Sequence, residues 1–162
     1  MNDAALCALA DRLAIHDVLT RYFHAVDHGQ LAELESCFTA DCIAIYDGEQ
    51  VAANRQDLMD FFTGKRASKV KPDFVNMKHR MHFIGNVTVT LNGETADSET
   101  YALAHLIDQP DQLRMRTRAL RYFDKLRREP GGWRIAHRRH VHEWSKTEPV
   151  DALSGPPWQG YR

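Results

Sequence analysis

The amino-acid sequence predicts an α+β domain in which helices pack on one face of a single curved, mainly antiparallel sheet. Two observations predict this class. Apolar residues recur at every third or fourth position up to about residue 62, and at every second position from about residue 77. Helices at the start of a chain, followed by long strands joined by hairpins, are typical of an α+β domain.

The first helix is predicted to begin at Asn2 or Asp3, both good capping residues, and to end at Gly29. Its apolar residues are spaced by three and four positions, which predicts one broad apolar face along the whole helix. These residues are Leu6, Leu9, Leu13, Ile15, Leu19, Tyr22, Phe23 and Val26.

Three short elements follow the first helix. Residues 30–38 predict a second helix with Phe38 on its apolar side. Residues 42–53 read as two short strands around an Asp-Gly turn, and residues 54–62 as a third helix that Asn54 caps.

Long strands are predicted from about residue 77 to residue 144. An Asn-Gly pair and the stretches DQPDQ and EPGG supply the turns between them. Strands of ten or more residues exceed the usual length, so we expect a strongly curved sheet that wraps a cavity. We therefore assign residues 1–145 to one domain and residues 146–162 to a C-terminal tail.

Composition excludes several classes of protein. The 162 residues carry a formal charge of -1, which provides no field to attract nucleic acid or anionic lipid. No apolar run approaches the roughly 20 residues that span a bilayer. Three cysteines without a CxxC pair predict a reduced, cytoplasmic protein. The expected partner is a small molecule of little charge.

Asp27 stands in the last turn of the first predicted helix, where backbone carbonyls present partial negative charge. A carboxylate there is disfavoured by a few tenths to about 1 kcal/mol, so another partner is expected. Two interpretations stay open. Either Asp27 caps the second helix or lies in solvent beside His28, or it lines a cavity and orients a base.

His79 and His82 stand in a predicted strand. Side chains three residues apart on a strand point to opposite faces, so this is not a metal pair and one ring points inward. In a straight strand His82 shares the face of Thr88. A bulge at residues 85–86 would instead place His82 on the face of Val87.

His140 and His142 share one face of the last predicted strand, a spacing that two zinc ligands can have. No third ligand stands nearby in the sequence, so no metal site is predicted.

Three segments together resemble a known family: RLAIHDVLTRYFHAVDHGQLAELESCFTADCIAIYDGE, MHFIGNVTVTLNGETADSETYALAHL and GGWRIAHRRHVHEW. They are similar to the cone-shaped α+β family named after nuclear transport factor 2, over roughly residues 5–145. Within it, the sequence is most similar to the SnoaL-like branch, which holds scytalone dehydratase, a bile-acid dehydratase and hexachlorocyclohexane dehydrochlorinase. The resemblance implies the cone fold, no cofactor, and a homo-oligomer that is a trimer or a dimer.

The resemblance also implies catalytic residues. The His-Asp pair of these lyases falls on His82 and Asp27. A tyrosine that precedes this aspartate in the bile-acid dehydratase falls on Tyr22, where the dehydrochlorinase has a lysine. Halide chemistry is therefore disfavoured for this chain.

Substrate-binding residues follow from the same resemblance. A pocket arginine of the dehydrochlorinase falls on Arg138. A tyrosine and the second histidine of scytalone dehydratase fall on Tyr46 and His105. Tyr101 shares a strand face with His105, which is more often a core face, and is kept as a candidate for the substrate wall.

Histidine begins with a pKa suited to removing a proton beside a carbonyl or an aromatic ring, and a carboxylate fixes its tautomer. We expect a cofactor-free, dehydratase-like lyase or an isomerase, acting on a small, mainly apolar aromatic or polycyclic substrate. One alternative is a non-catalytic ligand-binding or subunit-interaction module resembling the small subunit of aromatic-ring dioxygenases. Another is a hydrolase that activates water on an epoxide.

Overall fold

The computed structural model describes residues 2–71, 79–107 and 114–151. Three helices and six strands form in this part of the chain. Their bounds are α1 Asp3–His28, α2 Leu31–Ser36, β1 Phe38–Tyr46, β2 Glu49–Ala52, α3 Arg55–Phe62, β3 His79–Asn92, β4 Thr95–Ile107, β5 Arg114–Glu129 and β6 Gly132–Pro149.

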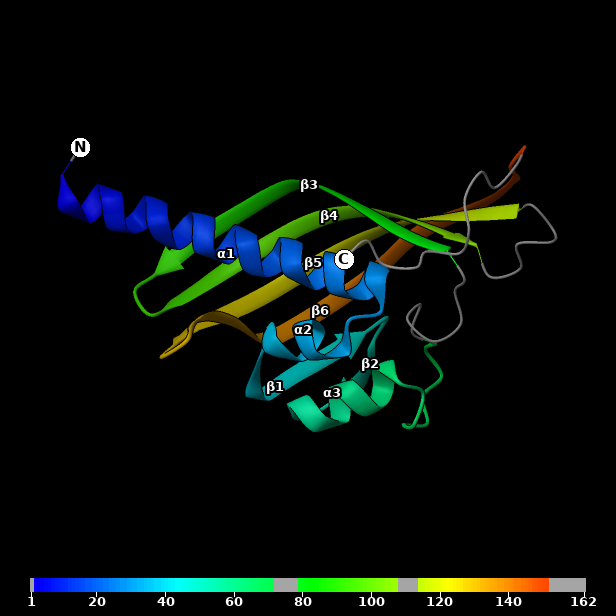
Figure 1. Ribbon diagram of the computed structural model, residues 1–162, viewed down its shortest axis with the longest axis horizontal. Coiled ribbons are helices and arrows are strands. Elements are labelled where there is room, and N and C mark those ends of the chain that lie inside the picture. Colours follow the sequence, from blue (N-terminus) through cyan, green and yellow to red (C-terminus); the bar gives the residue numbers. More distant parts are fainter. Residues whose placement is uncertain (1, 72–78, 108–113, 152–162) are drawn as a thin grey trace.

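All six strands belong to one sheet with the order β2-β1-β6-β5-β4-β3. Neighbours are antiparallel except β1 and β6, which are parallel. The helices lie together in front of the sheet, with α1 over the long strands and α2 and α3 at the β1 and β2 end (Figure 1). The predicted α+β class, with helices on one face of a curved sheet, is therefore confirmed.

The core forms between the helices and the inner face of the sheet. Ile15 and Leu19 of α1 have no exposed surface, and neither do Phe38, Leu58 and Ile135 from other elements. Complete burial of such a side chain contributes roughly 1.5–3 kcal/mol. The layer arrangement is thus held by apolar burial contributed from both ends of the chain.

The ends of α1 are as predicted. Asn2 caps the start by accepting the N–H of Ala5 at 2.9 Å, and Gly29 ends the helix with a φ of 68°. Gly29 suits this left-handed conformation because a Cβ atom would add strain there. The cap stops the helix two residues after Asp27, which leaves that side chain at the helix end.

The predicted apolar face of α1 is wrong in its first half. Leu6, Leu9 and Leu13 are 48%, 46% and 58% exposed, whereas burial begins at Ile15. The first turn of the helix extends beyond the end of the sheet (Figure 1). Leu13 lies beside the sheet, where the neighbouring Arg12 bonds to the backbone of β3, but its own side chain faces away from the sheet. Helical spacing predicted a stripe, but only the sheet decides how much of the stripe is covered.

The boundary between α2 and β1 differs slightly from the prediction. The second helix ends at Ser36, so Phe38 begins β1 instead of closing the helix. Phe38 pairs with Ile135 of β6, a contact between segments far apart in sequence. The Asp-Gly turn between β1 and β2 and the cap of α3 by Asn54 are confirmed.

The β3 strand contains the bulge on which the orientation of His82 depends. Gly85 pairs with Tyr101 and Thr88 with Glu99, so β3 has one residue more than β4 between these pairs. Asn86 takes a φ of 48° within this bulge. The extra residue places His82 on the inner face of the sheet.

The predicted C-terminal boundary needs correction. β6 continues to Pro149, which pairs with Arg114 of β5, so residues 146–149 belong to the sheet and not to a tail. Residues 150 and 151 follow the strand, and the remainder of the predicted tail, residues 152–162, lies outside the described residues. None of the described helices is long and apolar enough to cross a membrane.

Candidate active site

Asp27 and His82 form the centre of the candidate site. Oδ2 of Asp27 accepts the backbone N–H of His82 at 2.8 Å, and Oδ1 lies 2.6 Å from Nδ1 of the His82 ring. The His82 side chain is 3% exposed and that of Asp27 16%. Both oxygens of the carboxylate therefore hold one residue of the opposing strand.

This arrangement answers why a carboxylate stands in the last turn of α1. The backbone carbonyls of that turn disfavour it, but β3 supplies two donors directly opposite. Arg80 of the same strand donates to the backbone oxygen of Asp27 at 3.3 Å. Of the two sequence interpretations, the cap of the second helix is wrong, because Gln30 stands at that cap and the Asp27 carboxylate contacts His82.

Two tyrosines meet beside this pair. The hydroxyl groups of Tyr22, from α1, and Tyr46, from β1, are 2.9 Å apart, and both side chains are buried. Burial raises the pKa of Tyr22, and it raises the pKa of Tyr46 well above its usual value. Both phenols are therefore neutral. One of them donates to the other, which leaves one O–H free to donate to an oxygen that gains charge.

Arg138 lies behind Tyr22 and has no exposed surface. It donates two hydrogen bonds to Asp124, at 2.8 Å and 2.7 Å, and its guanidinium carbon is 3.8 Å from the centre of the Tyr22 ring. Although burial works against the charged form, the Asp124 carboxylate holds the pKa of Arg138 well above its usual value. Arg138 thus supports Tyr22 and does not face the cavity, which corrects the prediction of direct substrate contact.

A small cavity joins His82 to the two tyrosines. Its volume is about 30 Å³, and its lining is mostly aromatic. The residues around it are Tyr22, Val26, Tyr46, Phe62, Val70, Lys71, His82, Arg118, Tyr122 and His140. Among the residues that the structure describes, no three His, Cys, Asp or Glu side chains are grouped as metal ligands.

Comparison with known families identifies the domain. Residues 8–139, most of the chain, match the model of the SnoaL-like domain. The chain belongs to the SnoaL-like family.

Solved structures resemble this SnoaL-like domain over nearly their whole length. A candidate aromatic ring hydroxylase from Novosphingobium aromaticivorans is 27% identical, with 88% of this chain and 94% of that chain covered and a TM-score of 0.68. A candidate scytalone dehydratase from the same species is 18% identical, with coverage of 96% and 97% and a TM-score of 0.71. Hexachlorocyclohexane dehydrochlorinase from Novosphingobium barchaimii is 17% identical, with coverage of 94% and 99% and a TM-score of 0.75.

Two predicted substrate contacts are wrong for this cavity. In β4 the side chains of Ala102 and Ala104 are buried on the inner face, so Tyr101 and His105 point to the outer face. Tyr101 is 37% exposed and lies under the guanidinium of Arg121, while His105 lies 3.1 Å from the hydroxyl of Thr117. Strand alternation showed that Tyr101 and His105 share a face, but not which face the helices cover.

Sequence reasoning missed a second histidine-carboxylate pair in this SnoaL-like domain. Nδ1 of His140 lies 3.0 Å from Oδ1 of Asp47, and the same oxygen accepts the backbone N–H of His142 at 2.9 Å. The sequence offered Asp47 only as a turn residue, and the histidines only as a weak zinc pair. No local sequence pattern indicates this pair, because Asp47 and His140 become neighbours only through the parallel pairing of β1 and β6, which are distant in the sequence.

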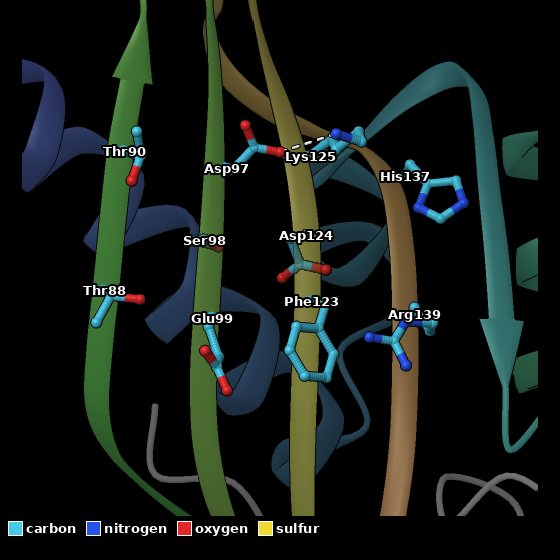
Figure 2. Close-up of a pocket in the computed structure, with 10 residues that line it drawn as sticks. All are labelled: Thr88, Thr90, Asp97, Ser98, Glu99, Phe123, Asp124, Lys125, His137 and Arg139. Carbon is cyan, nitrogen blue, oxygen red and sulfur yellow. Dashed lines mark hydrogen bonds and ion pairs between the residues drawn. The ribbon is translucent and has the colours of Figure 1, made fainter.

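A wider hollow of about 320 Å³ lies on the outer face of the sheet (Figure 2). Its described lining contains none of the predicted site residues. Asp97 lies 2.9 Å from Lys125, and Arg139 covers the ring of Phe123 at 4.0 Å. The full lining is Thr88, Thr90, Asp97, Ser98, Glu99, Phe123, Asp124, Lys125, His137 and Arg139.

Proposed function

We propose that this SnoaL-like protein is a cofactor-independent lyase of the dehydratase type, or an isomerase. His82 removes a proton from a carbon beside a carbonyl group or an aromatic ring. Asp27 holds the ring in the required tautomer and stabilises the imidazolium that forms. One phenol of the hydrogen-bonded pair Tyr22 and Tyr46 donates to the oxygen on which negative charge develops, while the other donates to its partner.

One observation carries this proposal: the Asp27 carboxylate contacts His82 at both the backbone N–H and the ring, at the wall of an aromatic cavity. A buried base with a fixed tautomer and phenol donors nearby is what proton abstraction at carbon requires. The named activities of the dehydratase and dehydrochlorinase structures, each an elimination, support the same class of reaction.

The substrate we propose is small, mainly apolar, and aromatic or polycyclic. Tyr46, Phe62 and Tyr122 supply rings on which such a molecule can stack, and Lys71 and Arg118 are the cationic groups at the lining. A volume of about 30 Å³ admits water but not a ring, so the lining side chains have to move when substrate enters.

The test uses a ketone without a leaving group. β-Tetralone is incubated in deuterium oxide, and the loss of its proton signals beside the carbonyl is followed by NMR. We expect exchange by the wild-type protein and its loss in His82→Gln. The matched control is His105→Gln, a histidine on the outer face, which should exchange at the wild-type rate. Equal rates in His82→Gln and the wild type would refute the proposal.

Lyase and isomerase activities are separated by two further ketones. A β-hydroxy ketone loses water if the protein is a lyase, whereas a β,γ-unsaturated ketone shifts its double bond if it is an isomerase. Product analysis after reaction in deuterium oxide distinguishes the two outcomes.

A non-catalytic subunit is the second candidate, and a specific observation favours it. Met81, Phe83 and Trp144 are more than half exposed at 57%, 69% and 53%, as in a face that meets another protein. The 27% identity to the candidate aromatic ring hydroxylase agrees with such a role. Co-purification with a larger oxygenase subunit, with no exchange of β-tetralone, would favour it. Analytical ultracentrifugation tests the predicted homo-oligomer.

A further inference from the structure

The second histidine-carboxylate pair lies in the same cavity as the first. His140 is 4% exposed and lines the cavity together with His82. His140 comes from β6, while His82 comes from β3 at the far edge of the sheet. One cavity therefore holds two imidazoles, each beside its own carboxylate.

The position of His140 is fixed by aromatic and polar contacts. Its ring stacks on Tyr46, with centroids 4.8 Å apart and planes inclined by 18°, and meets the edge of Tyr122 at 5.1 Å. Asp47 holds Nδ1 at 3.0 Å, and Arg118 lies 3.6 Å from the other oxygen of Asp47. Stacking on Tyr46 and the ion-pair contact with Asp47 thus define the orientation of the His140 ring.

Both the backbone and the side chain of Asp47 are hydrogen-bonded to β6. The backbone N–H of Asp47 donates to the oxygen of His140 at 3.1 Å, and Asp47 accepts the N–H of His142. Although partial burial acts in the opposite direction, the hydrogen bond from His140 lowers the pKa of Asp47. A carboxylate that stays ionised favours the protonated form of the imidazole beside it.

Aromatic rings connect the two imidazoles: His82 is 5.5 Å from Phe23, Phe23 is 5.0 Å from Tyr122, and Tyr122 is 5.1 Å from His140. Because both histidines also line one cavity, a molecule bound there can meet both imidazoles. An elimination can use two such groups, because the proton and the leaving group depart from different atoms.

We propose that His140 is the general acid that protonates the leaving group, with Asp47 as its positioning residue. This inference rests on the proposed function of His82 as the base. His82 takes the proton from the carbon beside the carbonyl, and the electron pair of that C–H bond forms the new C=C bond. The C–O bond at the next carbon breaks, and its electron pair stays on the oxygen, which takes a proton from His140 and leaves as water. Exchange with solvent then removes the proton from His82 and restores the one on His140.

The kinetic test compares three ketones of one skeleton. The β-hydroxy ketone formed from benzaldehyde and acetone must lose water, which needs an acid. Its para-nitrophenyl ether loses nitrophenolate, a leaving group that needs none. Benzylacetone has no leaving group and reports only proton exchange in deuterium oxide. The enone product and nitrophenolate are followed by absorbance, and exchange by NMR.

We expect His140→Gln to slow only the reaction whose leaving group needs an acid. His140→Gln lowers kcat for water loss by about 100-fold or more, the usual contribution of a general acid, and changes the other two reactions by less than about threefold. His82→Gln abolishes all three reactions. The matched control is His137→Gln, on the same strand but lining the outer hollow, and it leaves all three unchanged.

Each other outcome has a defined meaning. An equal loss of all three reactions in His140→Gln, or no loss in any, overturns the role of His140 and leaves that of His82 standing. If the wild-type protein acts on none of the three, the proposed function itself fails, and the role of His140 fails with it.

A second measurement needs no substrate. NMR of the protein with ¹⁵N-labelled histidine follows the protonation of His140. The polar and aromatic groups around this ring are Asp47, Arg118, Tyr46 and Tyr122. Tyr22, His82 and Lys71 lie elsewhere on the cavity lining. Asp47→Asn should lower the pH at which His140 loses its proton by about one unit or more, and Asp27→Asn should not. No change in Asp47→Asn would overturn the positioning role of Asp47.

Discussion

Asp27 and His82, 55 residues apart in the chain, are joined through both oxygens of one carboxylate. Oδ2 accepts the backbone N–H of His82 at 2.8 Å, while Oδ1 lies 2.6 Å from the ring. The carboxylate cannot rotate without breaking one of these contacts. The carboxylate therefore links the end of α1 to both the backbone and the ring of one residue of the edge strand β3.

The substitution Asp27→Asn tests the effect of the carboxylate on the His82 ring while keeping its contact with the His82 backbone. The amide oxygen can still accept the backbone N–H of His82, but the amide NH₂ then faces Nδ1 and disfavours the tautomer that serves as a base. We expect Asp27→Asn to fold and to exchange β-tetralone roughly 10⁴-fold more slowly, as for the aspartate of a serine-protease triad. Asp17→Asn, an exposed change on the same helix, is the control. A rate within tenfold of wild type would contradict an orienting role.

The hydroxyl contact between Tyr22 and Tyr46 predicts a stability effect. Tyr22→Phe keeps the ring beside Arg138 but removes the partner at 2.9 Å from the buried hydroxyl of Tyr46. The free energy of unfolding should fall by about 1–3 kcal/mol, measured by urea denaturation. Tyr101→Phe, on the exposed outer face, should change it by less than about 0.5 kcal/mol. Equal effects of the two variants would show that the buried contact contributes nothing.

The buried ion pair of Arg138 and Asp124 predicts strong coupling. Arg138→Met leaves the Asp124 carboxylate without its partner in a site with no exposed surface, and should cost about 3–5 kcal/mol of unfolding free energy. Adding Asp124→Leu should recover part of this loss, because the unpaired charge is then removed. Arg121→Met breaks partly exposed pairs with Glu99 and Glu143 and should cost about 0–1 kcal/mol for each pair. A double variant less stable than Arg138→Met would contradict the coupling.

The bulge in β3 can be tested at Asn86. Its φ of 48° strains a β-branched side chain, so Asn86→Val should destabilise the protein by about 1–2 kcal/mol. Asn86→Gly adopts this conformation freely and should stay within about 1 kcal/mol of the wild type. Urea denaturation measures both. If valine were tolerated as well as glycine, the strand would lack this bulge, and the inward orientation of His82 would lose its basis.

The three cysteines should differ in reactivity. Cys7 is exposed, whereas Cys37 and Cys42 are buried, and burial raises the pKa of Cys42 to about 11. Because the thiolate is the reactive form, Ellman's reagent at about pH 8 should modify one thiol rapidly in the folded protein and all three in urea. Cys7→Ser should remove the rapid phase. Rapid reaction in that variant would contradict the burial of the other two.

Much of the fold was predictable because it depends on local chemistry. Asn2 and Gly29 mark the ends of α1 through preferences of single residues. The period of two and the turn residues predicted the long hairpins, since a strand places alternate side chains on one face. The resemblance to SnoaL-like proteins then indicated which carboxylate and histidine, at Asp27 and His82, to examine together.

The contacts between distant segments were decided by the tertiary structure alone. The alternation of side chains along β4 places Tyr101 and His105 on one face. It does not show that the helices cover the opposite face. Spacing predicts an apolar stripe along α1 but not which of its residues the sheet covers, and Leu6 is exposed.

The same limit applies to the second histidine-carboxylate pair. His140 and Asp47 meet only because β1 and β6 run parallel as neighbours, a pairing between segments that no local pattern connects. Local preferences act over a few residues and can be read along the chain. Register, the covered face of a sheet and the partners of a buried charge depend on how the whole chain packs.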